Sequence, residues 1–220
     1  MLTRRGFMLG STLPLLAATQ QATQLPTGAP KSEELGFVVM RAGSRIGAHR
    51  LKFLPHPDGM DIQITVDITV RLGPITLFHY GLRGLEQWRG GQCTYAAANT
   101  NDDGTKAWMV AKRDAQGLWV SGSKAERYLA PANALVASHW NKAELKGPWI
   151  NLQNGKLFHP DCRDAGPAPV LLADGVKQPA ERYIISGDVH LEMWYDGPIW
   201  CGLVFTAKDG SEVRYEKLPA

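Results

Sequence analysis

Two histidines and one glutamate are the residues of this chain best suited to chemistry. His49 lies in the segment Ile46–Phe53, where alternate residues of an expected strand share a face, so His49 points the same way as Leu51 and Phe53. An imidazole on an apolar face can act as a general base or bind a metal ion, because its surroundings readily move its pKa. The alternative is a core histidine hydrogen-bonded to a neighbouring strand.

His139 and Glu86 are the expected partners of His49. His139 belongs to the run Ser138-His139-Trp140-Asn141, whose polar and aromatic side chains could form one wall of a pocket or simply cap and anchor that segment. Glu86 lies two residues before Trp88, and burial against an aromatic ring raises the pKa of a carboxyl group. The alternative for Glu86 is an acid in a turn beside a core aromatic. An enzyme hypothesis follows: a lyase, isomerase or hydrolase with His49 as base and His139 or Glu86 as partner.

Aromatic residues support a second hypothesis, a non-catalytic module that binds a small hydrophobic or aromatic molecule. The chain has seven tryptophans and six tyrosines, which suit either a core or an apolar cavity with polar tips. His49 would be a polar contact in such a cavity. The candidate ligand-binding residues are Trp88, Trp140, Asn141, Trp194 and Tyr195.

Known catalytic and metal-binding motifs are missing. The sequence has no G-x-S-x-G, no H-E-x-x-H and no P-loop, and it indicates no particular cofactor. His79 and His190 also fall on alternating faces, so a metal site built from histidines is a third hypothesis, without an assigned ligand set. The chain has three cysteines, Cys93, Cys162 and Cys201. Their spacing includes no C-x-x-C, which argues against a zinc knuckle. They allow one disulfide bond or none.

The N-terminus has the pattern of a twin-arginine export signal. Arg4 and Arg5 are followed by Phe7 and by an apolar run, Met8–Ala18, that is too short to span a bilayer. We therefore expect residues 1–22 to be a signal peptide, the export machinery to be a partner, and the mature protein to be periplasmic. An ordinary secretory signal or a retained N-terminal anchor are the alternatives.

Composition narrows the classes of partner. The formal net charge of the 220 residues is +3, with no basic tract for nucleic acid or a membrane surface. No later segment is long and apolar enough for stable membrane insertion of the mature chain. We expect a flexible leader at 23–35 and a single domain at 36–220, a length suited to one core.

Period-two alternation predicts an all-β fold. It is clearest at Ile62–Val70, where apolar and polar residues alternate without interruption. About a dozen short strands in series predict an antiparallel meander curled into a barrel or half-barrel, with a sandwich as the alternative. The Ala-rich segment 131–141 lacks alternation and predicts one short helical insert. Hairpin turns are expected at Asn154-Gly155, Asp196-Gly197 and Asp209-Gly210.

Four short blocks between Phe37 and Leu218 resemble the signature of a family of exported proteobacterial β-proteins known only as a domain of unknown function. The resemblance implies an exported β-domain and no particular activity. More distantly, the serial hairpins are similar to the half-barrels of periplasmic lipoprotein carriers, whose sheet wraps a helix around an apolar cavity. That similarity concerns the fold alone. The blocks are Ile46-Gly47-Ala48-His49, Glu86-Gln87-Trp88, Ser138-His139-Trp140-Asn141 and Trp194-Tyr195-Asp196-Gly197.

Overall fold

A computed structural model describes residues 29–30 and 33–219. The predicted signal peptide, 1–22, and most of the predicted leader lie outside the described residues. The first strand begins at Glu34, two residues before the expected start of the domain. No helix in the described part of the chain has the length and apolar character needed to cross a membrane.

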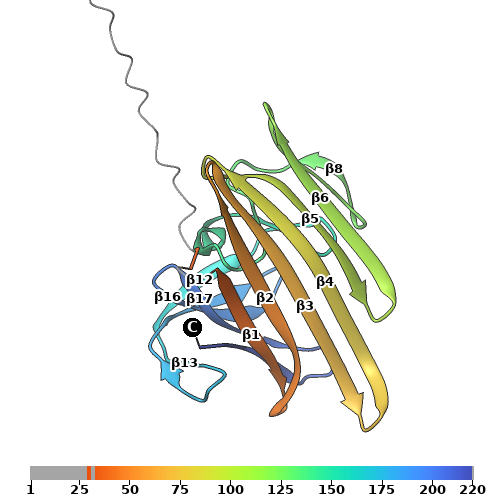
Figure 1. Cartoon of the computed structure of the whole chain (residues 1–220), viewed down its shortest axis with the longest axis vertical. Helices are drawn as coiled ribbons and strands as arrows, with labels where there is room; N and C mark the ends of the chain where they lie inside the picture. Colours follow the sequence, from red (N-terminus) through yellow and green to blue (C-terminus); the bar gives the residue numbers. More distant parts are fainter. Residues whose placement is uncertain (1–28, 31–32, 220) are drawn as a thin grey trace, which may run out of the picture.

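Thirteen strands form one open antiparallel sheet, which confirms the predicted meander and half-barrel (Figure 1). Its first part is a run of hairpins: β1 (Glu34–Arg41), β2 (Ser44–His56), β3 (Gly59–Leu72), β4 (Ile75–Arg89), β5 (Gln92–Asp102), β6 (Thr105–Asp114), β7 (Gly117–Gly122) and β8 (Ala125–Leu129). Its second part contains β12 (Asp161–Pro167), β15 (Glu181–Ser186), β16 (Leu191–Asp196), β17 (Ile199–Thr206) and β18 (Glu212–Lys217).

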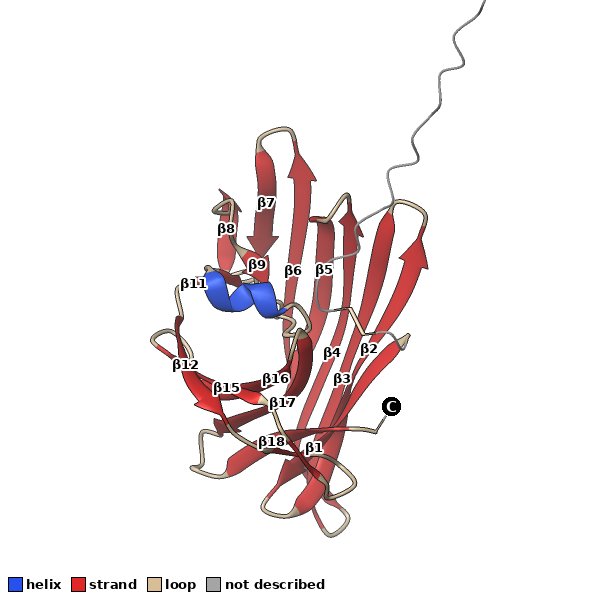
Figure 2. Ribbon diagram, turned by 90° about the vertical axis from the view of Figure 1, so that its left-hand side faces the viewer, coloured by secondary structure: helices blue, strands red, loops and turns tan. Residues whose placement is uncertain are grey.

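The two parts are joined in the middle of the sheet by the pairing of β1 with β18. Phe37 lies opposite Lys217, and the Leu218 N–H donates to the Gly36 carbonyl at 2.8 Å. The edges of the sheet are therefore β8 and β12. Figure 2 shows how the sheet curves, so that these two edges approach from opposite sides of a central insert.

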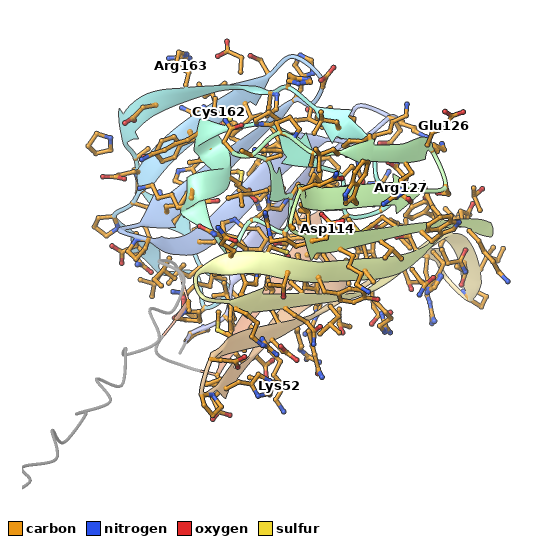
Figure 3. All side chains as sticks on the ribbon, turned by 90° about the horizontal axis from the view of Figure 1, so that it is seen from above. Lys52, Asp114, Glu126, Arg127, Cys162 and Arg163 are labelled. Carbon is orange, nitrogen blue, oxygen red and sulfur yellow. The ribbon has the colours of Figure 1, made fainter. Side chains whose placement is uncertain are left out.

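Side-chain alternation creates a buried concave face. In β3, Ile64 and Val66 are buried whereas Gln63 and Asp67 are exposed. In β2, Leu51 and Phe53 are buried together with His49, as predicted, and Lys52 points outward from the opposite face (Figure 3). The inward row of each long strand is apolar because it faces the core, and the outward row is polar because it meets water.

The helical insert lies elsewhere than predicted. The prediction of a helix over 131–141 is wrong: this segment contains β9 (Leu135–Val136), and within residues 29–30 and 33–219 helix is limited to the 3₁₀ helix η1 (Lys142–Lys146). Strand pairing overrides the helical propensity of the alanines, since β9 pairs with β10 (Trp149–Ile150), which in turn pairs with β11 (Leu157–Phe158). In Figure 2, η1 and this small sheet lie between the edges β8 and β12.

A second small hairpin covers the outer face of the sheet. It consists of β13 (Val170–Leu171) and β14 (Lys177–Gln178). Its apolar side chains pack with Cys201 and against the partly buried Trp194. The main core lies on the other face, between the concave sheet and the insert, and its largest fully buried side chains include Trp140, Trp149, Tyr195 and Trp200.

Candidate ligand-binding cavity

A cavity of about 670 Å³ lies on the concave face of the sheet. This volume falls within the range of small-molecule sites, roughly 300–1,000 Å³. β3 and β4 form one wall, β17 and β18 another, and the insert contributes a third through Trp149 and Leu152. The lining is mostly apolar and includes Ile64, Val66, Ile68, Phe78, Leu203 and Val213.

The charged lining residues lie at strand ends and in a hairpin turn, and Arg41 and Asp209 form an ion pair there; this set is Arg41, Asp102, Lys208 and Asp209. Uncharged polar side chains also line the cavity, from the sheet and from the insert: Tyr80, Ser138, Asn151, Gln153 and Tyr215. His49 and His139 lie deeper, on β2 and on the insert. Both imidazoles pack against the Trp200 ring, each with its centroid 5.4 Å from that of the tryptophan.

His139 is held in an uncommon backbone conformation. Its φ of 70° lies in the left-handed region, which costs a non-glycine residue about 1–3 kcal/mol. Three interactions fix it: the His139 N–H donates to Glu144 Oε2 at 3.1 Å, its Nδ1 lies 2.7 Å from Glu144 Oε1, and its carbonyl accepts from the Tyr195 hydroxyl at 2.9 Å. Strain held by several contacts in this way is typical of functional positions.

Glu144 is the site residue that the sequence analysis missed. It lies in η1, only 1% of its surface is exposed, and its backbone carbonyl accepts from Trp149 Nε1 at 2.7 Å. A carboxylate only accepts hydrogen bonds, so we assign the imidazole proton to Nδ1 of His139, which leaves Nε2 as the nitrogen that can meet a ligand. One sequence signal was present, because Asn141 and Glu144 have the spacing of a helix-capping box, and the Asn141 side chain does cap η1.

His49 lies on the wall of the same cavity but is chemically different from His139. Only 6% of it is exposed, and its ring packs among Phe37, Trp200 and Tyr215. Burial, reinforced by the nearby His139, lowers the pKa of His49 to about 3. The ring is therefore neutral at physiological pH and a weak base. Within the described part of the chain, His49 Nε2 has no hydrogen-bond partner.

Glu86 is buried behind the cavity rather than on its wall. Its Oε2 accepts from Trp88 Nε1 at 2.8 Å and from Trp140 Nε1 at 3.4 Å, and it is not among the residues that line the cavity. Burial raises the pKa of Glu86, although hydrogen bonds from Ser138 and the two indoles oppose this shift. The structure thus brings together His49 and His139 and leaves Glu86 apart.

The predicted ligand-binding residues are likewise absent from the lining of this cavity. Trp88 and Trp140 pack edge to face in the core, with ring centroids 5.3 Å apart. Trp194 faces the β13–β14 hairpin, Asn141 caps η1, and Tyr195 supports His139. The tryptophan that does line the cavity is Trp149, which the sequence analysis did not single out.

The remaining histidines and the cysteines do not form a cluster. The other four, His56, His79, His159 and His190, are exposed at separate places in the sheet and its turns. Among the described residues, no group of three or more histidine, cysteine or acidic side chains is arranged to hold a metal ion. The three cysteines are free thiols, two of them buried.

Comparisons with known proteins agree on the fold and assign no activity. No curated protein matches this chain. It is similar in structure to a β-barrel-like protein of the domain of unknown function DUF1849 from Brucella abortus, with a TM-score of 0.57 and 8% sequence identity, over 84% of this chain and 94% of that chain. At such identity the likeness concerns the fold alone. Residues 37–217 match the model of a family described as a domain of unknown function, and the chain therefore belongs to the DUF6134 family.

Proposed function

We propose that this protein is an exported, periplasmic binding protein that holds a small hydrophobic or aromatic molecule in its concave cavity. The cavity itself carries the proposal: it is preformed, has the volume of a small-molecule site, and combines an apolar wall with two histidines. Apolar surface that a ligand removes from water there contributes roughly 25 cal/mol per Å². The periplasmic location rests on the Arg4-Arg5 signal.

Binding of the fluorescent apolar probe N-phenyl-1-naphthylamine tests this proposal. Ile68 lines the cavity from β3, whereas its neighbour Thr69 points to the opposite face, so Ile68→Trp fills the cavity and Thr69→Trp is its matched control. With the probe excited directly, we expect saturable binding to the wild type and to Thr69→Trp, and at least about tenfold weaker binding to Ile68→Trp. No binding to the wild type, or equal binding to all three, would contradict the proposal.

The contact between His139 and Glu144 supports a second candidate, an acid/base enzyme of the lyase, isomerase or hydrolase type. A carboxylate that orients one imidazole nitrogen and leaves the other for substrate is a recurrent arrangement for a general base. The roles differ from those expected from sequence: His139 would be the base, Glu144 its positioning residue, and His49 a neutral hydrogen-bonding partner.

Turnover of p-nitrophenyl butyrate, an apolar ester, tests the hydrolase form of this candidate. We expect wild-type hydrolysis above the spontaneous rate, a loss of about 10²–10⁴-fold in His139→Gln, and a smaller loss with a shifted pH profile in Glu144→Gln. A wild-type rate equal to buffer alone, or equal rates in all variants, would count against hydrolysis by this pair.

A further inference from the structure

Two histidines that line the deep end of the cavity each have a ring nitrogen for which the described structure supplies no hydrogen-bond partner. His49 Nε2 is buried and has no hydrogen-bond partner in the described structure, and His139 Nε2 remains once Glu144 has taken Nδ1. Leaving a buried polar atom without a partner destabilises the protein, because that atom has lost its hydrogen bonds to water. A ligand group that forms hydrogen bonds with these nitrogens would remove this cost. The deep end should therefore favour ligands that carry a hydrogen-bonding group.

Electrostatics at the deep end disfavour an anionic ligand. The His139 imidazole is paired with the carboxylate of Glu144, and His49 is neutral. The cationic side chains in the lining, Arg41 and Lys208, lie at a strand end and a turn instead, so the described lining offers a buried carboxylate no cation at the deep end, where it would also lie near the carboxylate of Glu144. Burying a charge without a partner is much more costly than burying a hydrogen-bonded hydroxyl.

We infer that the cavity binds an uncharged amphiphile, an alcohol or phenol with an apolar body, whose hydroxyl lies at the His49–His139 end. This inference rests on the proposed binding function and specifies its ligand class. A hydroxyl both donates and accepts, so it can donate to His139 Nε2 while accepting from His49 Nε2 in the tautomer that carries the His49 proton on that nitrogen. The apolar body would extend from His49, which lies opposite Val66, past Ile68 and Val70 toward the charged turns.

Displacement of bound N-phenyl-1-naphthylamine by three ten-carbon compounds tests the inference at pH 7. The compounds are 1-decanol, decyl methyl ether, which cannot donate a hydrogen bond, and decanoate, which is charged. We expect 1-decanol to displace the probe at about tenfold lower concentration than either of the others, because a site built around a hydroxyl rejects analogues that lack it. Equal displacement by the alcohol and the ether, or stronger displacement by decanoate, would overturn the inference.

Two variants of His49 connect the preference to this residue. His49→Phe keeps an aromatic ring among Phe37, Trp200 and Tyr215 but removes the nitrogen, so the probe should still bind while the advantage of the alcohol over the ether falls below about threefold. His49→Gln places an amide near the position of Nε2 and should keep most of that advantage. An advantage retained in both variants would show that the hydroxyl binds elsewhere.

The outcomes separate this inference from the binding proposal. If the probe binds to the wild type and the alcohol has no advantage, the binding proposal stands and the hydroxyl preference is wrong. If the probe does not bind to the wild type, the binding proposal fails, and the inference fails with it. Thermal melting of each variant shows whether a loss of binding reflects a loss of folding.

Discussion

The two cavity histidines have opposite hydrogen-bonding environments. His139 is fixed at its N–H, its carbonyl and Nδ1, all by buried partners, while His49 Nε2 is packed among rings without a partner. One ring is therefore oriented by the protein, and the other is kept neutral by its surroundings. Each environment has a consequence for stability that can be measured without knowing the ligand.

Acidification should reveal the neutral burial of His49. The folded protein keeps this ring neutral down to its pKa of about 3, whereas the unfolded chain protonates it near the ordinary histidine pKa of 6.5. The corresponding stability is fully present above pH 6.5 and is lost as the pH falls toward 3, at about 1.4 kcal/mol per pH unit.

Urea unfolding of wild type and His49→Phe between pH 7 and pH 4 measures this effect. On acidification the free energy of unfolding of the wild type should fall relative to that of His49→Phe, because only the wild type loses the His49 contribution. The raised pKa of Glu86 acts in the opposite direction, but it is common to both proteins and cancels in the difference. Parallel curves would show that His49 is not buried neutral.

Glu144→Gln should destabilise the fold by about 1–3 kcal/mol. The amide replaces one acceptor oxygen by a donor, and both carboxylate oxygens of Glu144 face donors on His139. Glu126→Gln, at an exposed position of the edge strand β8, is the control and should change the free energy of unfolding by less than about 0.5 kcal/mol. Equal effects of the two changes in urea unfolding would contradict the role assigned to Glu144.

For single residues, the sequence predicts which face of a strand a side chain occupies better than it predicts which residue that side chain contacts. Alternation correctly places His49 beside Leu51 and Phe53, because the period of a strand determines which way a side chain points. It does not reveal that His139 pairs with Glu144, since that contact depends on a single 3₁₀ turn. Alternation along β16 also separates Tyr195, in the core, from Trp194, against the β13–β14 hairpin, but it does not indicate which of these two faces is the concave one.

Among the elements, the insert depends on close backbone contact with the edge of the sheet. A Cβ on Gly122, at the end of β7, would lie 2.1 Å from the Asn154 carbonyl oxygen and 2.9 Å from the Gly155 Cα. The Tyr128 hydroxyl of β8 donates to the Gly155 carbonyl at 2.9 Å. The loop between β10 and β11 is thereby tied to β7 and β8, and this loop carries cavity residues such as Leu152.

Gly122→Ala should therefore lower the free energy of unfolding by about 1–3 kcal/mol and weaken probe binding, since the insert must move to make room. Gly81→Ala on β4 is the control, because a Cβ there comes no closer than 3.5 Å to another side chain. That change should be neutral or slightly stabilising. Chemical unfolding and N-phenyl-1-naphthylamine titration measure both effects, and a harmless Gly122→Ala would contradict this account of the insert.

The strands were predictable and the insert was not, for a physical reason. Long strands such as β3 carry their own periodic signal, and turns such as Asn154-Gly155 mark the ends of elements. The segment 131–141 has an Ala-rich composition that favours helix locally, but it gains more by pairing Leu135 and Val136 with β10. Such pairing depends on residues outside the segment itself, so the composition of the segment does not predict it.

For the molecule as a whole, the prediction of export depends on residues 1–22, which lie outside the described structure. Replacing both Arg4 and Arg5 by lysine should leave the protein in the cytoplasm, because the export machinery reads the arginine pair itself. Arg45→Lys, at an exposed position near the start of β2, is the control and should be exported normally. Fractionation of periplasm and cytoplasm checks both, and unchanged export of the double variant would favour the ordinary secretory route.

The curvature and the open shape of the sheet follow from a long series of hairpins, and both were predicted. The pairing of β1 with β18 was not, since alternation shows which side chains point inward but not which distant strands meet. The pairing matters for the site because β1 and β2 contribute one side of the cavity and β17 and β18 another.

The same pairing makes this fold a circular permutation of a simple meander. If Leu218 were linked to Glu34 and the chain reopened at the exposed turn Ala132-Asn133, every neighbour in the large sheet would follow its predecessor along the chain. Such a permutant would keep the cavity but replace the most distant strand pairing by a local hairpin. Because folding slows as contacting residues lie further apart in sequence, it should refold faster than the natural order of strands.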